Sequence, residues 1–225
     1  MPPADKPGPS ARPRAVLFDW DNTLVDNWDA IGEALNTTLV AFGHAPWTEA
    51  ETRERVRRSM RDSFPVMFGD RWEEARDLFY ARFTAGHLST LKALPGAAEL
   101  LEALEAMGLY LGVVSNKHGD LLRREAAHLG WTGRFRRLVG AGDAVADKPD
   151  AAPIALALEG SGIETGGSVW FVGDAGIDLA CAKNAGCVGV LIGPADLKAK
   201  EFQGLVPAWH VEGFAQLRAL AGVRR

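Results

Sequence analysis

The chain has 225 residues, of which 47% are hydrophobic and 24% are charged, and these proportions are typical of a globular protein with a sizeable core. They exclude a wholly disordered chain, a collagen and a disulfide-stapled miniprotein. The formal net charge of −4 argues against nucleic acid and anionic membrane surfaces as partners, and two cysteines are too few for a disulfide framework.

The N-terminal segment MPPADKPGPSARP is rich in proline and predicts a flexible tail over residues 1–13. The apolar run that follows, from Ala15 to Phe18, is too short for the apolar region of a secretory signal. No stretch of the sequence approaches the ~18 uncharged apolar residues that a membrane-spanning helix needs. We therefore expect a cytoplasmic protein that does not associate with a membrane.

The first predicted strand covers residues 15–18, and a long segment without a convincing strand follows it. Residues 27–91 instead contain helical patterns at roughly 28–42, 48–60 and 72–87. This segment is too long and too rich in helix to be a connecting loop. We predict an inserted α-helical cap sub-domain over residues 27–91, with hinges near Asp26 to Trp28 and Leu91 to Pro95, on a core domain formed by residues 14–26 and 92–225.

Strands and helices alternate in the remainder of the chain. Apolar runs that do not alternate with polar residues predict buried strands, and they cover 109–114, 138–141, 168–172 and 188–192. Amphipathic patterns predict helices at 97–107, 120–129, 151–158 and 175–185. This alternation predicts an α/β fold, with a Rossmann-like parallel sheet that helices cover on both faces.

Polar side chains of an unusual kind follow four of the predicted strands. They are Asp19 and Asp21, then Ser115 and Asn116, then Lys148, and finally Asp174 and Asp178. Because the carboxyl ends of parallel strands share one edge of the sheet, these groups should converge there. Several carboxylates in one crevice need a cation, and hard oxygen ligands suit Mg²⁺ together with a substrate phosphate. The sequence thus predicts a magnesium and phosphate site.

The motifs DWDNT, VVSNK, DKPD and GDAGID, in that order, resemble the four motifs of the haloacid dehalogenase-like superfamily of phosphohydrolases, and the resemblance covers residues 14 to about 193. The stretch VGDAGIDLACAKNAGC, together with a helical cap between the first two motifs, is similar to the subgroup of phosphoglycolate phosphatase-like enzymes. The resemblance implies a HAD-like fold and a Mg²⁺-dependent phosphomonoester hydrolase. Its substrate would be a small phosphorylated metabolite, with 2-phosphoglycolate as the first candidate.

The resemblance also implies roles for single residues. Asp19 would be the nucleophile that forms an aspartyl-phosphate. Asp21 would protonate the leaving oxygen and then take a proton from water, and its backbone carbonyl would bind the metal. Asp19 and Asp174 would supply metal carboxylates, with Asp178 binding directly or through water. The transferring phosphoryl group would be held by Ser115 and Lys148, with Thr23 and Asn116 in supporting roles.

Asn22 departs from the family pattern, where glycine is common. Asparagine tolerates a left-handed backbone better than other residues with a side chain. We therefore expect the loop to keep its shape.

The cap sequence excludes some activities and leaves others open. Residues 24–91 contain no lysine, which argues against a phosphonoacetaldehyde hydrolase, and the presence of Asp21 argues against a haloacid dehalogenase proper. Arg58 belongs to a cluster of cap arginines, one of which could pair with an anionic substrate. Most of these arginines are expected on solvated helix faces.

Two other functions remain open from the sequence. A phosphosugar mutase similar to β-phosphoglucomutase would pass the phosphoryl group from the same aspartate to a sugar hydroxyl. A non-catalytic protein that binds a phosphorylated ligand would keep the fold without the reaction. The amphipathic cap helices are also compatible with a dimer face, so the sequence allows either a monomer or a homodimer.

Overall fold

The computed structural model describes residues 12–56 and 58–222. Residues 1–11 of the predicted flexible tail lie outside the described residues. Pro13, which we predicted to be part of that tail, is buried, and the adjacent Arg14 donates its backbone N–H to Ser168 O at 2.8 Å. Pro13 therefore packs on the core. In the described part of the chain, no helix is long and apolar enough to cross a membrane.

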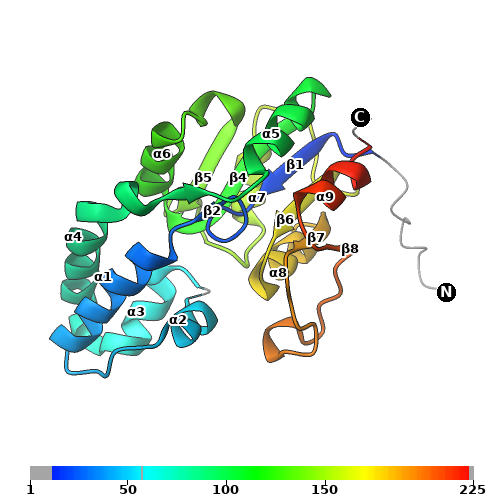
Figure 1. Cartoon of the computed structure of the whole chain (residues 1–225). Coiled ribbons are helices and arrows are strands. Elements are labelled where there is room, and N and C mark those ends of the chain that lie inside the picture. The colour runs from blue at the N-terminus through cyan, green and yellow to red at the C-terminus, as the bar shows by residue number, and fades with distance from the viewer. Residues whose placement is uncertain (1–11, 57, 223–225) are drawn as a thin grey trace.

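A six-stranded parallel sheet forms the centre of the molecule, in the order β5-β4-β1-β6-β7-β8 (Figure 1). All five predicted strands are confirmed, and β8 was missed because it has only three residues with His210 in the middle. The strands are β1 (Ala15–Phe18), β4 (Tyr110–His118), β5 (Arg137–Ala141), β6 (Val169–Gly173), β7 (Val188–Ile192) and β8 (Trp209–Val211). Because β1 lies between β4 and β6, the chain after it emerges at the middle of the carboxyl edge.

Helices cover both faces of the sheet, which confirms the predicted α/β architecture. Val16 and Phe18 pack into a cluster with helices α5 (Ala97–Ala106), α6 (Gly119–His128) and α9 (Phe214–Leu220). Ala15 and Leu17 point the other way, toward α7 (Ala152–Leu158) and α8 (Gly176–Asn184). Every residue of β1 is therefore buried, which is why its sequence is a continuous apolar run.

Four further helices lie beside the sheet, at the lower left of Figure 1, and three of them share a second hydrophobic cluster. They are α1 (Trp28–Ala41), α2 (Glu49–Arg55), α3 (Met60–Phe68) and α4 (Trp72–Thr90). The chain crosses to and from them through β2 (Val25–Asp26) and β3 (Lys92–Ala93), which pair antiparallel. Both crossings therefore lie side by side. We call α1 to α4 the cap helices.

The single helix predicted over 48–60 is wrong, because the chain forms two helices there. Helix α2 ends at Arg55, and α3 begins at Met60 and continues through Pro65. Proline removes a backbone donor and disfavours a helix interior, so α3 was not predicted from the sequence. Burial of Phe64 and Phe68 in the second hydrophobic cluster stabilises the helix in spite of Pro65. Single-turn 3-10 helices complete the fold at Gly69–Arg71, Thr132–Arg134 and Lys200–Phe202.

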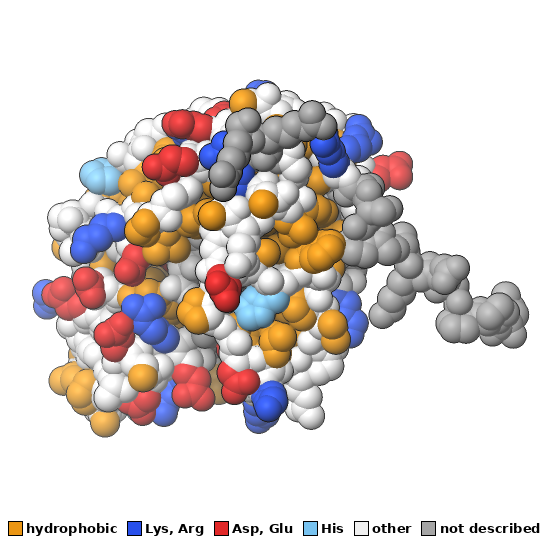
Figure 2. Space-filling model, turned by 45° about the vertical axis from the view of Figure 1, so that its right-hand side comes forward, with side chains coloured by type: hydrophobic (Ala, Val, Ile, Leu, Met, Phe, Trp, Pro, Cys, Tyr) orange, Lys and Arg blue, Asp and Glu red, His pale blue; other side chains and the backbone are white. Residues whose placement is uncertain are grey.

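Acidic and basic side chains are intermingled over the face drawn in Figure 2. On the cap helices, Arg53 pairs with Glu49 and Arg55 pairs with Glu51, each one helical turn away. Exposed pairs of this kind contribute little to stability. These two arginines therefore lie at the solvated surface of the cap, as the sequence led us to expect for most of them.

Candidate active site

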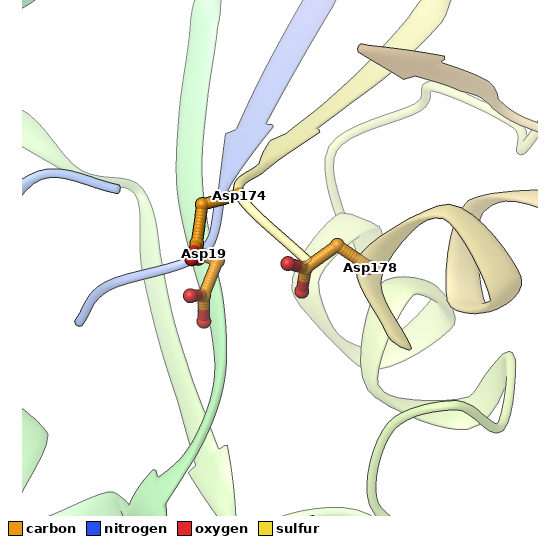
Figure 3. A group of neighbouring side chains, drawn as sticks. All are labelled: Asp19, Asp174 and Asp178. Atoms are coloured by element: carbon orange, nitrogen blue, oxygen red, sulfur yellow. The ribbon is translucent and has the colours of Figure 1, made fainter. Parts of the chain in front are cut away.

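Three carboxylates meet at the carboxyl edge of the sheet. Asp19 follows β1, Asp174 follows β6, and Asp178 lies in the first turn of α8. Each offers a carboxylate oxygen within 4.8 Å of those of the other two. In Figure 3, Asp19 and Asp174 lie side by side and Asp178 faces them from its helix. The structure thus brings together residues that are about 150 positions apart in the chain, as the topology predicted.

Lys148 binds two of these carboxylates. Its Nζ donates to Asp19 Oδ1 at 2.6 Å and to Asp178 Oδ1 at 2.7 Å. Its backbone is held by Asn116, whose Oδ1 accepts from Lys148 N at 3.0 Å and whose Nδ2 donates to Lys148 O at 3.2 Å. Burial disfavours the ammonium ion, but Asp178 and Asp19 outweigh this effect and raise the pKa of Lys148.

The donor set fits a divalent cation. Burial is the largest influence on Asp178 and raises its pKa to about 7, although Lys148 acts in the opposite direction. The nearby Asp19 and Asp174 raise it further, so one lysine does not balance the charge of the three acids. Hard carboxylate oxygens at this spacing are ligands that Mg²⁺ accepts. A bound cation would relieve the repulsion.

Asn22 and Thr23 fix the direction of Asp174. Asn22 Nδ2 donates to Asp174 Oδ2 at 2.6 Å, and Thr23 Oγ1 donates to Asp174 Oδ1 at 3.4 Å. The backbone of Asn22 is left-handed, with φ 63°, the conformation that asparagine was expected to tolerate. Thr23, for which the resemblance implied a supporting role at the phosphate, is buried and is not among the described residues that line the cavity.

Asp21 follows Asp19 by two residues and contacts Lys117, whose Nζ donates to Asp21 Oδ1 at 2.6 Å. Burial raises the pKa of Asp21 to about 7; Lys117 lowers it, and Glu125 raises it. A carboxyl group that titrates near neutral pH can both donate and accept a proton. Ser115 is also buried at this edge, and its Oγ accepts from Lys117 N at 3.2 Å.

The sequence did not single out Lys117 or Glu125. Lys117 stands in the motif VVSNK, two residues after Ser115, but it was given no role. Glu125 had a clearer signal, since it occupies the same buried helix face as Leu121, Leu122 and Ala126. A charged residue on an apolar helix stripe is costly unless it has partners.

A cavity of about 160 Å³ separates this edge from the cap helices. Its floor contains the acids, Ser115, Asn116 and the two lysines. Its roof is mainly apolar, and includes Trp28, Ile31, Met60, Phe64, Phe79 and Phe83. Arg58 also lines the cavity and is exposed. Arg55 lines it too, but it already pairs with Glu51 and lies over the ring of Trp47 at 4.7 Å.

Residues 16–192 match the family of haloacid dehalogenase-like hydrolases. The chain belongs to this family. It is 35% identical over 189 residues to a phosphoglycolate phosphatase of Xylella fastidiosa, covering 82% of each chain. It is also 35% identical over 187 residues to a phosphoglycolate phosphatase of Rhodospirillum rubrum, covering 77% of each.

Solved structures show the same fold. A haloacid dehalogenase-like family protein of Streptococcus pneumoniae superposes with a TM-score of 0.81 at 20% identity, covering 92% of this chain and 98% of that one. A predicted phosphoglycolate phosphatase of Haemophilus somnus superposes with a TM-score of 0.78 at 22% identity, covering 94% and 99%. The family match and the curated relatives place the chain in the class of phosphoric monoester hydrolases.

Proposed function

We propose that this enzyme hydrolyses a small phosphorylated metabolite through an aspartyl-phosphate on Asp19, with Mg²⁺ as cofactor. The observation that carries the proposal is the position of Asp19. It follows the central strand, it is paired with Lys148 at 2.6 Å, and it shares one cavity with Asp21. A phosphoryl group in this cavity would therefore meet Asp19 as nucleophile, Asp21 as proton donor and the ammonium group of Lys148.

In the first half of the reaction, a carboxylate oxygen of Asp19 attacks phosphorus. The bond between phosphorus and the ester oxygen breaks, and Asp21 donates its proton to that oxygen as the alcohol leaves. The Ser115 hydroxyl and the Lys148 ammonium group donate hydrogen bonds to the other phosphoryl oxygens. Such positioned charges supply most of the rate enhancement in phosphoryl transfer.

In the second half, water attacks the phosphorus of the aspartyl-phosphate. Asp21, now ionised, takes the proton from this water, and the bond between phosphorus and the Asp19 oxygen breaks. Inorganic phosphate and the original carboxylate of Asp19 result. The apolar roof excludes bulk water while the alcohol leaves.

The metal would be held by the carboxylates of Asp19 and Asp174 and by the backbone carbonyl of Asp21, with Asp178 binding directly or through a water molecule. When bound, Mg²⁺ supplies positive charge that offsets the negative charge of the phosphoryl oxygens. Asn22 and Thr23 keep Asp174 pointed toward this position.

We propose 2-phosphoglycolate as the first substrate to test, because the curated relatives that the chain matches carry the name of that phosphatase. Arg58 is the cap residue that we propose for the substrate carboxylate. The mutase alternative is disfavoured, since the curated relatives that the chain matches carry the name of a phosphatase. A purely binding protein would need neither Asp19 nor Asp21.

The test is phosphate release from 2-phosphoglycolate, sugar phosphates and nucleotides, with and without Mg²⁺. Metal-dependent release is expected, and Asp19→Asn should abolish it while the circular dichroism spectrum stays unchanged. Asp70→Asn, the same substitution at an exposed cap position, should keep full activity. Full activity of Asp19→Asn would remove the proposed nucleophile. Turnover that requires a bisphosphorylated sugar and releases little phosphate would favour the mutase.

A further inference from the structure

Glu125 is a carboxylate inside the protein that the reaction described above does not use. Its side chain is fully buried, three side chains donate to it, and a fourth, His87, lies within hydrogen-bond distance. Trp20 Nε1 donates to Oε2 at 2.7 Å, and Asn27 Nδ2 donates to Oε1 at 2.9 Å. His87 Nδ1 lies 2.9 Å from Oε1, and Lys117 Nζ lies 2.7 Å from Oε2 and 2.9 Å from Oε1.

These contacts are consistent with an ionised carboxylate. Burial alone would raise the pKa of Glu125, but the hydrogen bond from His87 and the charge of Lys117 outweigh it and lower the pKa. The ring of His87 is also buried, and among the described residues its Nε2 has no hydrogen-bond partner.

Two partners of Glu125 lie next to the two chain crossings between the core and the cap helices. Asn27 directly precedes α1, and His87 lies in the last turn of α4. Lys117 comes from β4 of the core and reaches Asp21. One carboxylate on α6 therefore connects the hinge of the cap to the proposed proton donor.

The geometry of Lys117 gives this connection a chemical consequence. An ammonium group has three N–H donors, and here it makes two contacts with Glu125 and one with Asp21 Oδ1. With two donors anchored, the third points in a fixed direction. Asp21 is then held through one oxygen, and its other oxygen is left to exchange a proton.

We propose that Glu125 is a positioning residue that acts through Lys117. It holds the carboxyl group of Asp21 in line with the leaving oxygen of the substrate. Asn27 and His87 bind the same carboxylate and so attach the hinge of the cap to Glu125. This inference rests on the proposed role of Asp21 as proton donor. A hydrophobic residue at this position would leave the buried donors of Trp20, Asn27 and Lys117 without this acceptor. The carboxylate therefore binds side chains of the cap hinge and of the core at the same time.

The test separates proton donation from every other step. 4-Nitrophenolate leaves as a stable anion and needs little help from an acid, whereas ethanol needs a proton. Both esters lack the carboxylate of 2-phosphoglycolate, so the identity of the natural substrate does not affect the comparison. With enzyme in excess over ester and Mg²⁺ present, release of the alcohol in the first turnover reports only transfer to Asp19.

Glu125→Gln keeps the size of the side chain and removes its charge. We expect the first-turnover rate with ethyl phosphate to fall roughly 10- to 100-fold, because general acid catalysis contributes roughly 10²- to 10⁴-fold. The rate with 4-nitrophenyl phosphate should fall by no more than about threefold relative to that of the unmodified protein, because this leaving group needs little help from an acid. Glu164→Gln, the same change at an exposed loop position, should alter neither rate.

His87 offers a second route if Glu125→Gln does not fold. His87→Asn keeps a donor near the position of Nδ1 and should retain the ethyl phosphate rate, whereas His87→Leu should lower that rate selectively. Equal losses for both esters in folded variants would show a merely structural role and overturn the proposal, as would no loss for either ester. If the unmodified protein hydrolyses neither ester, the proposed function is refuted instead.

Discussion

At the scale of single residues, much of the site consists of side chains that hold other side chains. Asn116 fixes the backbone of Lys148 through two hydrogen bonds, and Asn22 fixes Asp174. Each pair joins segments far apart in the chain. The sequence could identify the groups that would carry the reaction, but it did not show what holds them in place.

Arg58 carries the residue-scale prediction on substrate choice. If it pairs with the carboxylate of 2-phosphoglycolate, Arg58→Gln should raise KM for that ester about tenfold, because a charged hydrogen bond is worth about 1.5–3 kcal/mol. KM for ethyl phosphate, which lacks the carboxylate, should not change. Steady-state kinetics check this, with Arg82→Gln on the exposed surface of α4 as the control. An equal rise for both esters would contradict the assignment.

At the scale of elements, the turn between β6 and α8 places two of the three acids. Gly173 ends β6, and a Cβ at this position would lie 2.3 Å from the carboxyl carbon of Asp178. Glycine is therefore required here for close packing, and not for an unusual backbone angle. The lack of a side chain lets the first turn of α8 bring Asp178 beside Asp174.

Gly173→Ala should therefore displace Asp178 and lower the apparent Mg²⁺ affinity or the activity roughly 10- to 100-fold. The measurement is phosphate release as a function of Mg²⁺ concentration. Gly167→Ala is the matched control, because it lies before the same strand and a Cβ there meets nothing within 4 Å. Normal metal dependence of Gly173→Ala would show that the close contact is unimportant.

An ion pair also connects the cap helices with the core. Arg61 Nε on α3 lies 2.5 Å from Asp147 Oδ2, and the Asp147 side chain is 1% exposed. Asp147 directly precedes Lys148, so this contact joins helix α3 of the cap to the loop that carries Lys148.

Loss of this contact should make closure of the cavity less favourable. Arg61→Gln is expected to raise KM about fivefold, equivalent to about 1 kcal/mol for a partly exposed ion pair, with a smaller effect on kcat. The difference from the unmodified protein should shrink at high salt, which screens the pair. A fall in kcat at constant KM would instead indicate that Arg61 acts on the chemical step.

At the scale of the whole molecule, the sheet gathers three carboxylates at its carboxyl edge, whereas acidic and basic side chains are intermingled on the face drawn in Figure 2. Each acid of the cluster comes from a position that the fold fixes independently. The folded protein should therefore bind Mg²⁺ far better than the unfolded chain does, and binding should stabilise the fold.

Mg²⁺ at a concentration about 100 times its Kd should stabilise the protein by about 2.7 kcal/mol. Thermal unfolding with and without the ion should show a higher Tm in its presence. Asp174→Asn removes one carboxylate and should abolish most of the shift, whereas Asp70→Asn should keep it. A Tm that does not respond to Mg²⁺ would argue against a metal site in the folded protein.

Continuous apolar runs predicted the five longer strands, because strands that are buried on both faces exclude polar residues. The segments that the sequence missed or misjudged are those where distant packing overrides local preference. Helix α3 runs through Pro65 because Phe64 and Phe68 are buried against other cap helices. The short strand β8 is stabilised by pairing with β7.

The sequence by itself determined the α/β architecture and the residue types at the strand ends, since both follow from local periodicity and from the order of the motifs. Only the tertiary structure decided which groups touch. Thr23 faces Asp174, Lys117 bridges Asp21 and Glu125, and Arg61 meets Asp147. Such contacts depend on the relative placement of segments up to about 150 residues apart, and no local pattern of residues encodes that placement.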